Sequence, residues 1–123
     1  STDDRLRAAL EALIKCYPLV AVTNNPTLPA EKTLTALGVR DLFVGLIGLD
    51  TTGVSKPHVK PFLAASELAR CPIIECLSVG DRYDIDIALP LELGMGGILV
   101  DGVEDVYALP GILLTAPSGI QSA

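Results

Sequence analysis

Four short apolar runs, separated by segments with helical spacing, constrain the fold of this chain most strongly. The runs are residues 19–22, 42–47, 73–79 and 97–100. They are mostly continuous rather than alternating, as in parallel strands that are buried on both faces. Strands that alternate with helices favour right-handed crossovers. The predicted fold class is α/β, a three-layer α/β/α, Rossmann-like parallel sheet.

Helix and turn signals fill the segments between the runs. Asp3 and Asp4 suit an N-cap and a first helical turn, and Gly38 and Gly94 suit the ends of later helices. The first two expected helices span residues 4–17, ended by Pro18, and about 29–37. A third begins at Lys56-Pro57, and a fourth is kinked near Pro90 and ends at Leu93. A short fifth helix is expected over residues 103–109. Residues 50–53 are expected to be a loop. Residues 1–123 are expected to form one domain, with a frayed tail over about 115–123.

Composition excludes several classes of function. Half of the 123 residues are apolar, mean hydropathy is +0.48, and the net charge is -6. An acidic chain without clustered Lys and Arg argues against sequence-independent nucleic-acid binding. No apolar run reaches the roughly 18 residues of a membrane span, and from the polar start we expect no signal peptide. Cys16, Cys71 and Cys76 lack metal or disulfide spacing, which predicts buried thiols and a cytoplasmic protein.

Polar residues gather where three of the predicted strands end. The first run leads into Thr23-Asn24-Asn25, Lys56 follows the second, and the third leads into Asp81, with Asp84 and Asp86 beyond. Ligands of open α/β sheets bind beyond the carboxyl ends of the strands. A hydroxyl, a cation and carboxylates at one rim suit phosphoryl transfer, in which catalysis is mostly charge neutralisation and positioning.

Each of these features also has a purely structural interpretation. Thr23 and Asn24 can form a turn that caps a helix, and Lys56 can be a solvated side chain. The acids can cap the next helix instead of binding Mg²⁺, and alone they leave these two interpretations about equally supported. His58 is expected to be a surface or helix-terminus residue rather than a catalyst.

The spacing of three motifs resembles the haloacid dehalogenase superfamily of phosphatases and related hydrolases. Residues 20–25 resemble its second motif, an apolar strand that ends in Thr or Ser. Residues 55–62 resemble its third, a Lys-Pro followed by Phe, and residues 79–87 resemble its fourth, a strand followed by Gly-Asp and further acids. The resemblance covers about residues 6–114.

The resemblance implies a role for each matching residue. Thr23 and the amide of Asn24 would bind phosphoryl oxygens, and Lys56 would neutralise the phosphate and the nucleophile. Asp81 would bind Mg²⁺, and Asp86 would orient the metal shell or Lys56. Asp84 would be a possible contact of the groups that bind the metal, rather than a direct metal ligand. The implied activity is Mg²⁺-dependent hydrolysis of a small phosphorylated metabolite.

The family's first motif, a central strand that ends in Asp-x-Asp and carries the nucleophile, is absent from residues 1–123. Residues 84–86 read Asp-Ile-Asp but follow no buried strand, and Asp50 follows an apolar run but lies after the second motif. A nucleophile at Asp50 would require a permuted site, so a loop acid is the preferred interpretation. We therefore expect the chain alone to be inactive, since covalent catalysis needs that carboxylate.

A missing central strand also predicts exposed strand edges. We expect the gap to be filled by a companion N-terminal fragment, by self-association, or by direct pairing of the first and third strands. Two alternative functions stay open: a catalytically inactive domain that keeps the phosphate and metal rim for binding or assembly, and a doubly wound ligand-binding domain related only by architecture.

Overall fold

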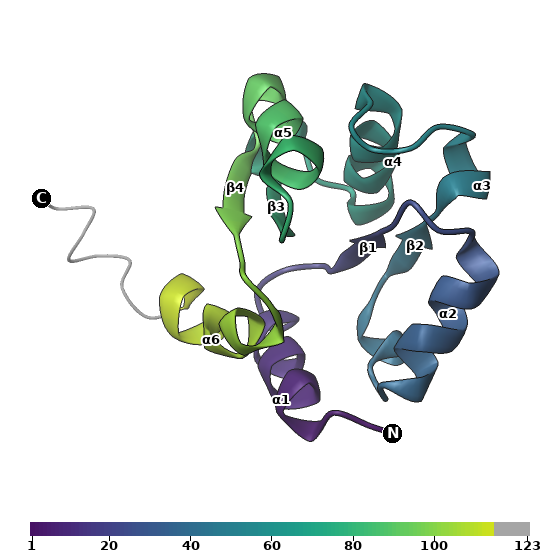
Figure 1. Cartoon of the computed structure of the whole chain (residues 1–123). Coiled ribbons are helices and arrows are strands. Elements are labelled where there is room, and N and C mark those ends of the chain that lie inside the picture. The colour runs from purple at the N-terminus through teal and green to yellow at the C-terminus, as the bar shows by residue number, and fades with distance from the viewer. Residues whose placement is uncertain (115–123) are drawn as a thin grey trace, which may run out of the picture.

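The computed structural model describes residues 1–114, which form two pairs of parallel strands surrounded by helices (Figure 1). Strand β1 (Val20–Val22) pairs with β2 (Gly45–Ile47), and β3 (Leu77–Gly80) pairs with β4 (Gly96–Leu99). Within the described residues no ladder joins β1 to β3, so the strands form two separate two-stranded sheets. Direct pairing of the first and third strands, one of the three possibilities expected for the gap, is therefore wrong, whereas the expectation of an incomplete core is confirmed.

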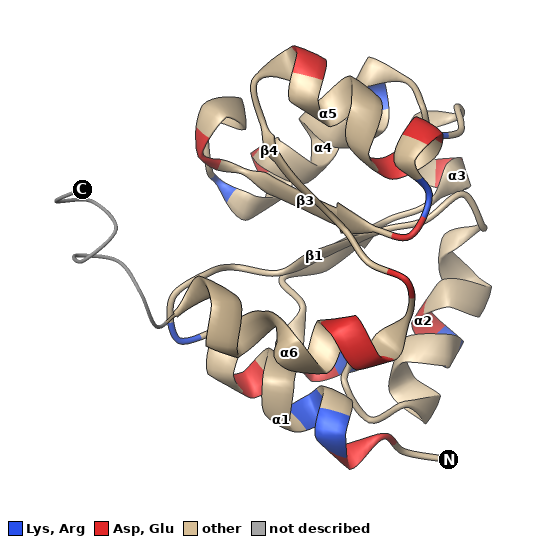
Figure 2. Cartoon of the chain, turned by 60° about the vertical axis from the view of Figure 1, so that its left-hand side comes forward, with Lys and Arg blue, Asp and Glu red and all other residues tan. Residues whose placement is uncertain are grey.

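The helices cover both sides of the strands, which confirms the three-layer α/β/α class. Figure 2 shows α4 and α5 on one side of the strands, and α1, α2 and α6 on the other. Their bounds are α1 Asp4–Leu13, α2 Thr27–Ala36, α3 Leu49–Thr52, α4 Val59–Ala69, α5 Ala88–Leu93 and α6 Val103–Leu113. Short 3-10 turns occupy Arg40–Leu42 and Ile73–Glu75, and a π-helical turn occupies Tyr83–Ile87. No helix among residues 1–114 combines the length and the apolar character needed to cross a bilayer.

The main hydrophobic core lies where α1 and α6 meet the strands and α2. Its buried members are Leu10, Leu13, Val39, Leu42 and Leu109. Leu19, which precedes β1, and Ile98 of β4 pack against this cluster. The core therefore anchors both strand pairs to one helical layer and fixes where their carboxyl ends lie.

Asp3 and Tyr107 join α1 to α6 at the edge of this core. The Asp3 carboxylate accepts a hydrogen bond from the Leu6 N–H at 3.0 Å, which confirms the predicted N-cap, and another from the Tyr107 hydroxyl at 2.6 Å. The bond from Tyr107 lowers the pKa of Asp3, and the same bond raises the pKa of Tyr107. The Arg5 guanidinium lies 4.3 Å from the centre of the Tyr107 ring.

Several predicted boundaries are wrong for local reasons. The third strand is shorter than expected, because Pro72 starts a 3-10 turn at residues 73–75 and the strand begins only at Leu77. Residues 42–44 likewise precede β2, because Leu42 ends a 3-10 turn and turns into the core. Residues 50–53 are not a loop but the short helix α3 and its cap, Gly53, whose left-handed φ of 78° suits glycine.

Other differences concern helix ends and cysteines. Helix α4 begins after His58 rather than at Lys56, and α6 continues past Leu109 with Pro110 inside it. Cys16 is exposed because it lies in the turn after α1, and Cys71 and Cys76 are half-buried, so the expectation of three buried thiols is wrong. The expected tail at 115–123 lies outside the described residues.

Candidate active site

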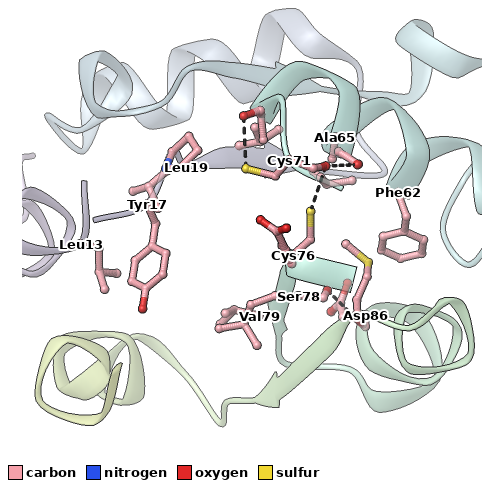
Figure 3. A pocket seen from close by; sticks show the side chains of 18 of the residues that line it. Leu13, Tyr17, Leu19, Phe62, Ala65, Cys71, Cys76, Ser78, Val79 and Asp86 are labelled. Carbon is pink, nitrogen blue, oxygen red and sulfur yellow. Dashed lines mark hydrogen bonds between the residues drawn. The ribbon is translucent and has the colours of Figure 1, made fainter. Parts of the chain in front are cut away.

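The candidate site lies in the gap between β1 and β3, at the carboxyl ends of both strands. A cavity of about 250 Å³ occupies this gap, lined by residues of both strands and of the helices on either side. Figure 3 shows Ser78 and Asp86 together on one side of the cavity, and Leu13 of α1 and Tyr17, which follows α1, on the other side. The walls are mostly apolar, and Lys56 and Asp86 are charged groups at the carboxyl ends of the strands.

Lys56 bridges the two strand pairs. Its Nζ donates to the Val22 carbonyl oxygen of β1 at 3.0 Å and to Asp86 Oδ1 at 2.7 Å. The two side chains are only 13% and 10% exposed, so this ion pair is shielded from water. An ammonium group has three protons. Two are used in these bonds, which leaves one donor for a further acceptor in the gap.

The side chain of Asn24 holds the backbone of Lys56 from both sides. Asn24 Oδ1 accepts from the Lys56 N–H at 2.7 Å, and Asn24 Nδ2 donates to the Lys56 carbonyl oxygen at 3.2 Å. The peptide bond between Lys56 and Pro57 is cis. The loop that follows β1 therefore fixes the position of the lysine, although 32 residues separate the two positions.

Asp86 is held against the end of β3. It is 7% exposed, its Oδ2 accepts from the Arg82 N–H at 3.2 Å, and its carbonyl oxygen accepts from Ser78 Oγ at 2.6 Å. A Cβ added at Gly80 would collide with the Asp86 side chain. Glycine at position 80 thus allows the carboxylate to approach the strand and reach Lys56.

Thr23 and Asn24 lie beside Lys56 with polar groups available. Thr23 Oγ1 accepts from the Asn25 N–H at 3.1 Å, so the hydroxyl proton can still be donated to another acceptor. Among residues 1–114 the Asn24 N–H has no hydrogen-bond acceptor. The rim of β1 therefore offers a hydroxyl and a backbone amide next to an ammonium group, which suits an anion.

The remaining acids lie further out. Asp81 and Asp84 are exposed, and neither forms an ion pair within the described part of the chain. No three His, Cys, Asp or Glu residues of the described part are grouped as a metal site would require. Asp86 contacts Lys56 rather than another acid.

Asp50 and His58 have structural roles. Asp50 accepts from the Thr27 N–H at 2.9 Å and from the Thr27 hydroxyl at 2.8 Å, and so caps α2 from a distance. These bonds lower the pKa of Asp50. His58 Nδ1 accepts from the Lys60 N–H at 3.1 Å and caps α4. Both observations favour the structural interpretations preferred from the sequence.

Sequence reasoning missed three contributions to this site: the side-chain clamp of Asn24, the hydroxyl of Ser78 and the space left by Gly80. An asparagine after a strand suggests only a local turn. The clamp joins residues far apart in the sequence, so no local signal could reveal it. The Gly80 role does have a weak signal, because glycine inside a strand often marks a close approach.

Comparisons with known proteins show what the chain is similar to. Residues 2–94 match the family described as haloacid dehalogenase-like hydrolase. A phosphoglycolate phosphatase from Pectobacterium atrosepticum is 31% identical over 112 residues, which cover 76% of this chain and 48% of that protein. A glyceraldehyde 3-phosphate phosphatase from Methanothermobacter thermautotrophicus is 29% identical over 87 residues, 71% of this chain and 38% of that protein.

A solved structure also resembles the chain. The HAD phosphatase from Thermococcus onnurineus superposes with a TM-score of 0.78 at 27% identity, covering 87% of this chain and 55% of that one. The chain thus spans about half or less of the length of these proteins.

Proposed function

This chain belongs to the haloacid dehalogenase-like hydrolase family, and from that premise we propose that it forms the phosphate-binding part of a phosphatase. The proposed reaction is Mg²⁺-dependent phosphoryl transfer from a small phosphorylated metabolite to an aspartate outside residues 1–123. The observation that carries the proposal is the position of Lys56. Its ammonium group lies at the carboxyl end of the gap between β1 and β3 and retains one free donor.

The proposed roles follow from the contacts at the rim. The Thr23 hydroxyl and the Asn24 backbone amide donate to phosphoryl oxygens, and Lys56 neutralises the charge of the phosphate and of the incoming carboxylate. Asp86 is a positioning residue, because it acts by holding Nζ of Lys56 at 2.7 Å. A lysine fixed by a carboxylate, a carbonyl and the Asn24 clamp needs little reorganisation when charge develops beside it.

Mg²⁺, when bound, would supply charge neutralisation at the transferring group. Asp81 is the residue of this chain that we propose as a ligand, since it is an exposed carboxylate at the end of β3 and Mg²⁺ prefers oxygen donors. The described residues do not gather three such groups. The other donors would therefore come from water and from the segment that carries the nucleophile.

The substrate class rests on the relatives. The two related enzymes named above act, by their names, on phosphoglycolate and on glyceraldehyde 3-phosphate, both small phosphorylated molecules. We propose a substrate of this size and charge for the complete protein. The alternative is an inactive member of the family that keeps the rim for binding. For the chain alone this alternative is favoured because the Asp86 carboxylate in the cavity is already paired with Lys56.

The experiment measures phosphate binding and phosphate release separately. Binding of inorganic phosphate to the 123-residue chain is followed by phosphorus NMR, with and without Mg²⁺. We expect weak binding that Lys56→Met reduces at least about tenfold. Lys60→Met serves as the matched control, because Lys60 is exposed on α4 and lies outside the cavity. Equal effects of the two substitutions would contradict the phosphate role of Lys56.

Phosphate release from a generic aryl phosphate is then compared between this chain and a longer form of the protein. We expect the chain alone to be inactive and the longer form to be active with Mg²⁺. Turnover by the pure 123-residue chain would disprove the external nucleophile. An inactive longer form that still binds phosphate would support the binding-domain alternative.

A further inference from the structure

We propose that Cys71 and Cys76 form a redox-active pair, whose thiols a small disulfide such as oxidised glutathione converts into a reversible protein disulfide. The pair lies where α4 ends and β3 begins, whereas Lys56 lies at the carboxyl end of the strands. The cysteines are thus separate from the candidate active site. The inference does not depend on the proposed function.

The two thiols belong to one wall of the cavity. Both are half-buried and line the gap between β1 and β3, as Figure 3 shows. The Cys76 sulfur lies 3.7 Å from the Cys71 carbonyl oxygen and 3.3 Å from the carbonyl oxygen of Pro72. A 3-10 turn over Ile73–Glu75 turns the chain back between the two cysteines. The side chain of Cys76 therefore lies against the backbone of Cys71.

The backbone that carries Cys71 is held in place. Its N–H donates to the Ser66 carbonyl oxygen at 3.1 Å, and its carbonyl oxygen accepts from the buried Ser66 hydroxyl. Arg70, which precedes it, ends α4 in the left-handed conformation, with a φ of 57°. These contacts fix the backbone at the pair, so the formation of a disulfide depends on the side chains.

The movement required is a rotation of the Cys71 side chain. Its sulfur donates to the Ala69 carbonyl oxygen at 3.4 Å, and so points away from Cys76. A thiol is a weak hydrogen-bond donor, so little opposes the loss of this bond. The cavity of about 250 Å³ leaves room for the rotation on the side that both cysteines line.

The reaction exchanges one disulfide for another. The Cys71 thiolate attacks one sulfur of oxidised glutathione, forms a mixed disulfide and releases one glutathione thiolate. Deprotonated Cys76 then attacks the Cys71 sulfur, forms the bond between the two cysteines and releases the second glutathione thiolate. The protein loses two electrons and two protons, and oxidised glutathione gains both as it becomes two thiols. An excess of reduced glutathione reverses these steps.

The surroundings of the two thiols set the order of the steps. Burial raises the pKa of the Cys76 thiol, and the nearby Cys71 adds to this effect. Because the thiolate is the reactive form, Cys76 is the poorer choice for the first attack. Once deprotonated, a thiol of higher pKa is the stronger nucleophile, which suits Cys76 to the second attack.

Cys16 provides a control within the same chain. It is exposed and lies outside the wall that carries Cys71 and Cys76. We therefore expect Cys16 to form a mixed disulfide with glutathione and to go no further. The comparison separates the pairing of two thiols from the reactivity of a single thiol.

The test locates the disulfide by mass spectrometry. The 123-residue chain is equilibrated with oxidised and reduced glutathione, free thiols are blocked with N-ethylmaleimide, and the chain is digested with trypsin. Arg70 and Arg82 bracket a peptide 71–82 that contains both Cys71 and Cys76, whereas Cys16 falls in a separate peptide 16–32. An internal disulfide lowers the mass of peptide 71–82 by about 2 Da and leaves it no thiol to block.

The expected result follows from effective concentration. Glutathione is used at about 0.1 mM, below the roughly millimolar effective concentration of a thiol in the same molecule. We expect the internal disulfide of peptide 71–82 to exceed its mixed disulfide with glutathione at least about tenfold. Peptide 16–32 should carry glutathione alone.

Two serine variants test the order of the steps, after circular dichroism has shown that both are folded. Cys76→Ser should trap Cys71 as the mixed disulfide with glutathione. Cys71→Ser should leave Cys76 modified more slowly than Cys71 is modified in the first variant. Equal rates, or a faster reaction of Cys76, would overturn the assigned order.

The wild-type chain decides the proposal without any variant. Glutathione on peptide 71–82 with no internal disulfide would overturn the pair. The same holds if peptide 71–82 stays reduced while peptide 16–32 is modified, or if its cysteines join two chains instead of each other. None of these readouts involves phosphate, so they stand whether the proposed function holds or fails.

Discussion

The pair formed by Lys56 and Asp86 allows the site geometry to be tested through stability. Removing one partner of a shielded ion pair leaves the other charge uncompensated, which costs about 3–5 kcal/mol. Lys56→Met leaves the Asp86 carboxylate with only the Arg82 N–H at 3.2 Å, and we expect it to lose about 3 kcal/mol or more of the free energy of unfolding. Asp86→Asn keeps one oxygen, which can accept from Lys56, but the amide NH2 replaces the oxygen that accepts from the Arg82 N–H, so we expect a loss of about 2 kcal/mol.

The double variant distinguishes this interaction from general damage. With both charges removed, we expect Lys56→Met with Asp86→Asn to lose no more than Lys56→Met alone, which gives a coupling of about 2 kcal/mol. Urea denaturation measures all four proteins, and an unchanged m-value confirms that the same surface unfolds. Effects that add within about 0.5 kcal/mol would refute the inference that the two side chains interact in the folded protein.

Three further predictions concern other contacts. Gly80→Ala should displace Asp86 and so weaken phosphate binding about as much as Asp86→Asn does, measured by the same phosphorus NMR titration. Asp50→Asn should make stability depend less on pH in acid. The lowered pKa of Asp50 adds stability above about pH 4, and this stability is lost as the pH falls through the folded-state pKa. Thermal melts from pH 2 to pH 7 measure this dependence, and the same pH dependence in the variant as in the wild type would contradict the prediction. Tyr107→Phe should make stability depend less on pH in alkali. The raised pKa of Tyr107 adds stability that is present below about pH 10 and is lost as the pH rises through the folded-state pKa. Urea denaturation from pH 8 to pH 11 measures this dependence, and an unchanged dependence on pH in the variant would argue against the hydrogen bond from Tyr107 to Asp3.

The sequence predicted the layers of this fold because their signals are local. Apolar runs of strand length and the Asp3 cap can each be recognised from residues that are adjacent in the sequence, and both are present in the structure. Boundaries were less predictable where one residue changes the backbone. Pro72 turns part of an apolar run into a 3-10 turn, which hydrophobicity alone does not distinguish from a strand.

The positions of the candidate site residues were predicted only in part. The order of Thr23, Lys56 and Asp81 along the chain predicted a common rim, whereas the acid that the structure brings to Lys56, at 2.7 Å, is Asp86, and Asp81 is exposed. How the lysine is held could not be predicted, because the Asn24 clamp spans 32 positions. The gap itself had only an indirect signal in the sequence, the absence of a strand that ends in Asp-x-Asp. Its shape depends on how α4 and the pair of α1 and α6 hold the two sheets apart.

The most direct measurement of the central claim is amide hydrogen exchange in the isolated 123-residue chain, resolved by NMR. Within β3 the N–H groups of Ser78 and Gly80 face β4, whereas those of Leu77 and Val79 face the gap. An incomplete core predicts an alternating pattern, in which Leu77 and Val79 exchange at least about a hundredfold faster than Ser78 and Gly80. Uniformly slow exchange along β3 would show that its edge is already covered in the chain alone, and would contradict a core that awaits a strand from elsewhere.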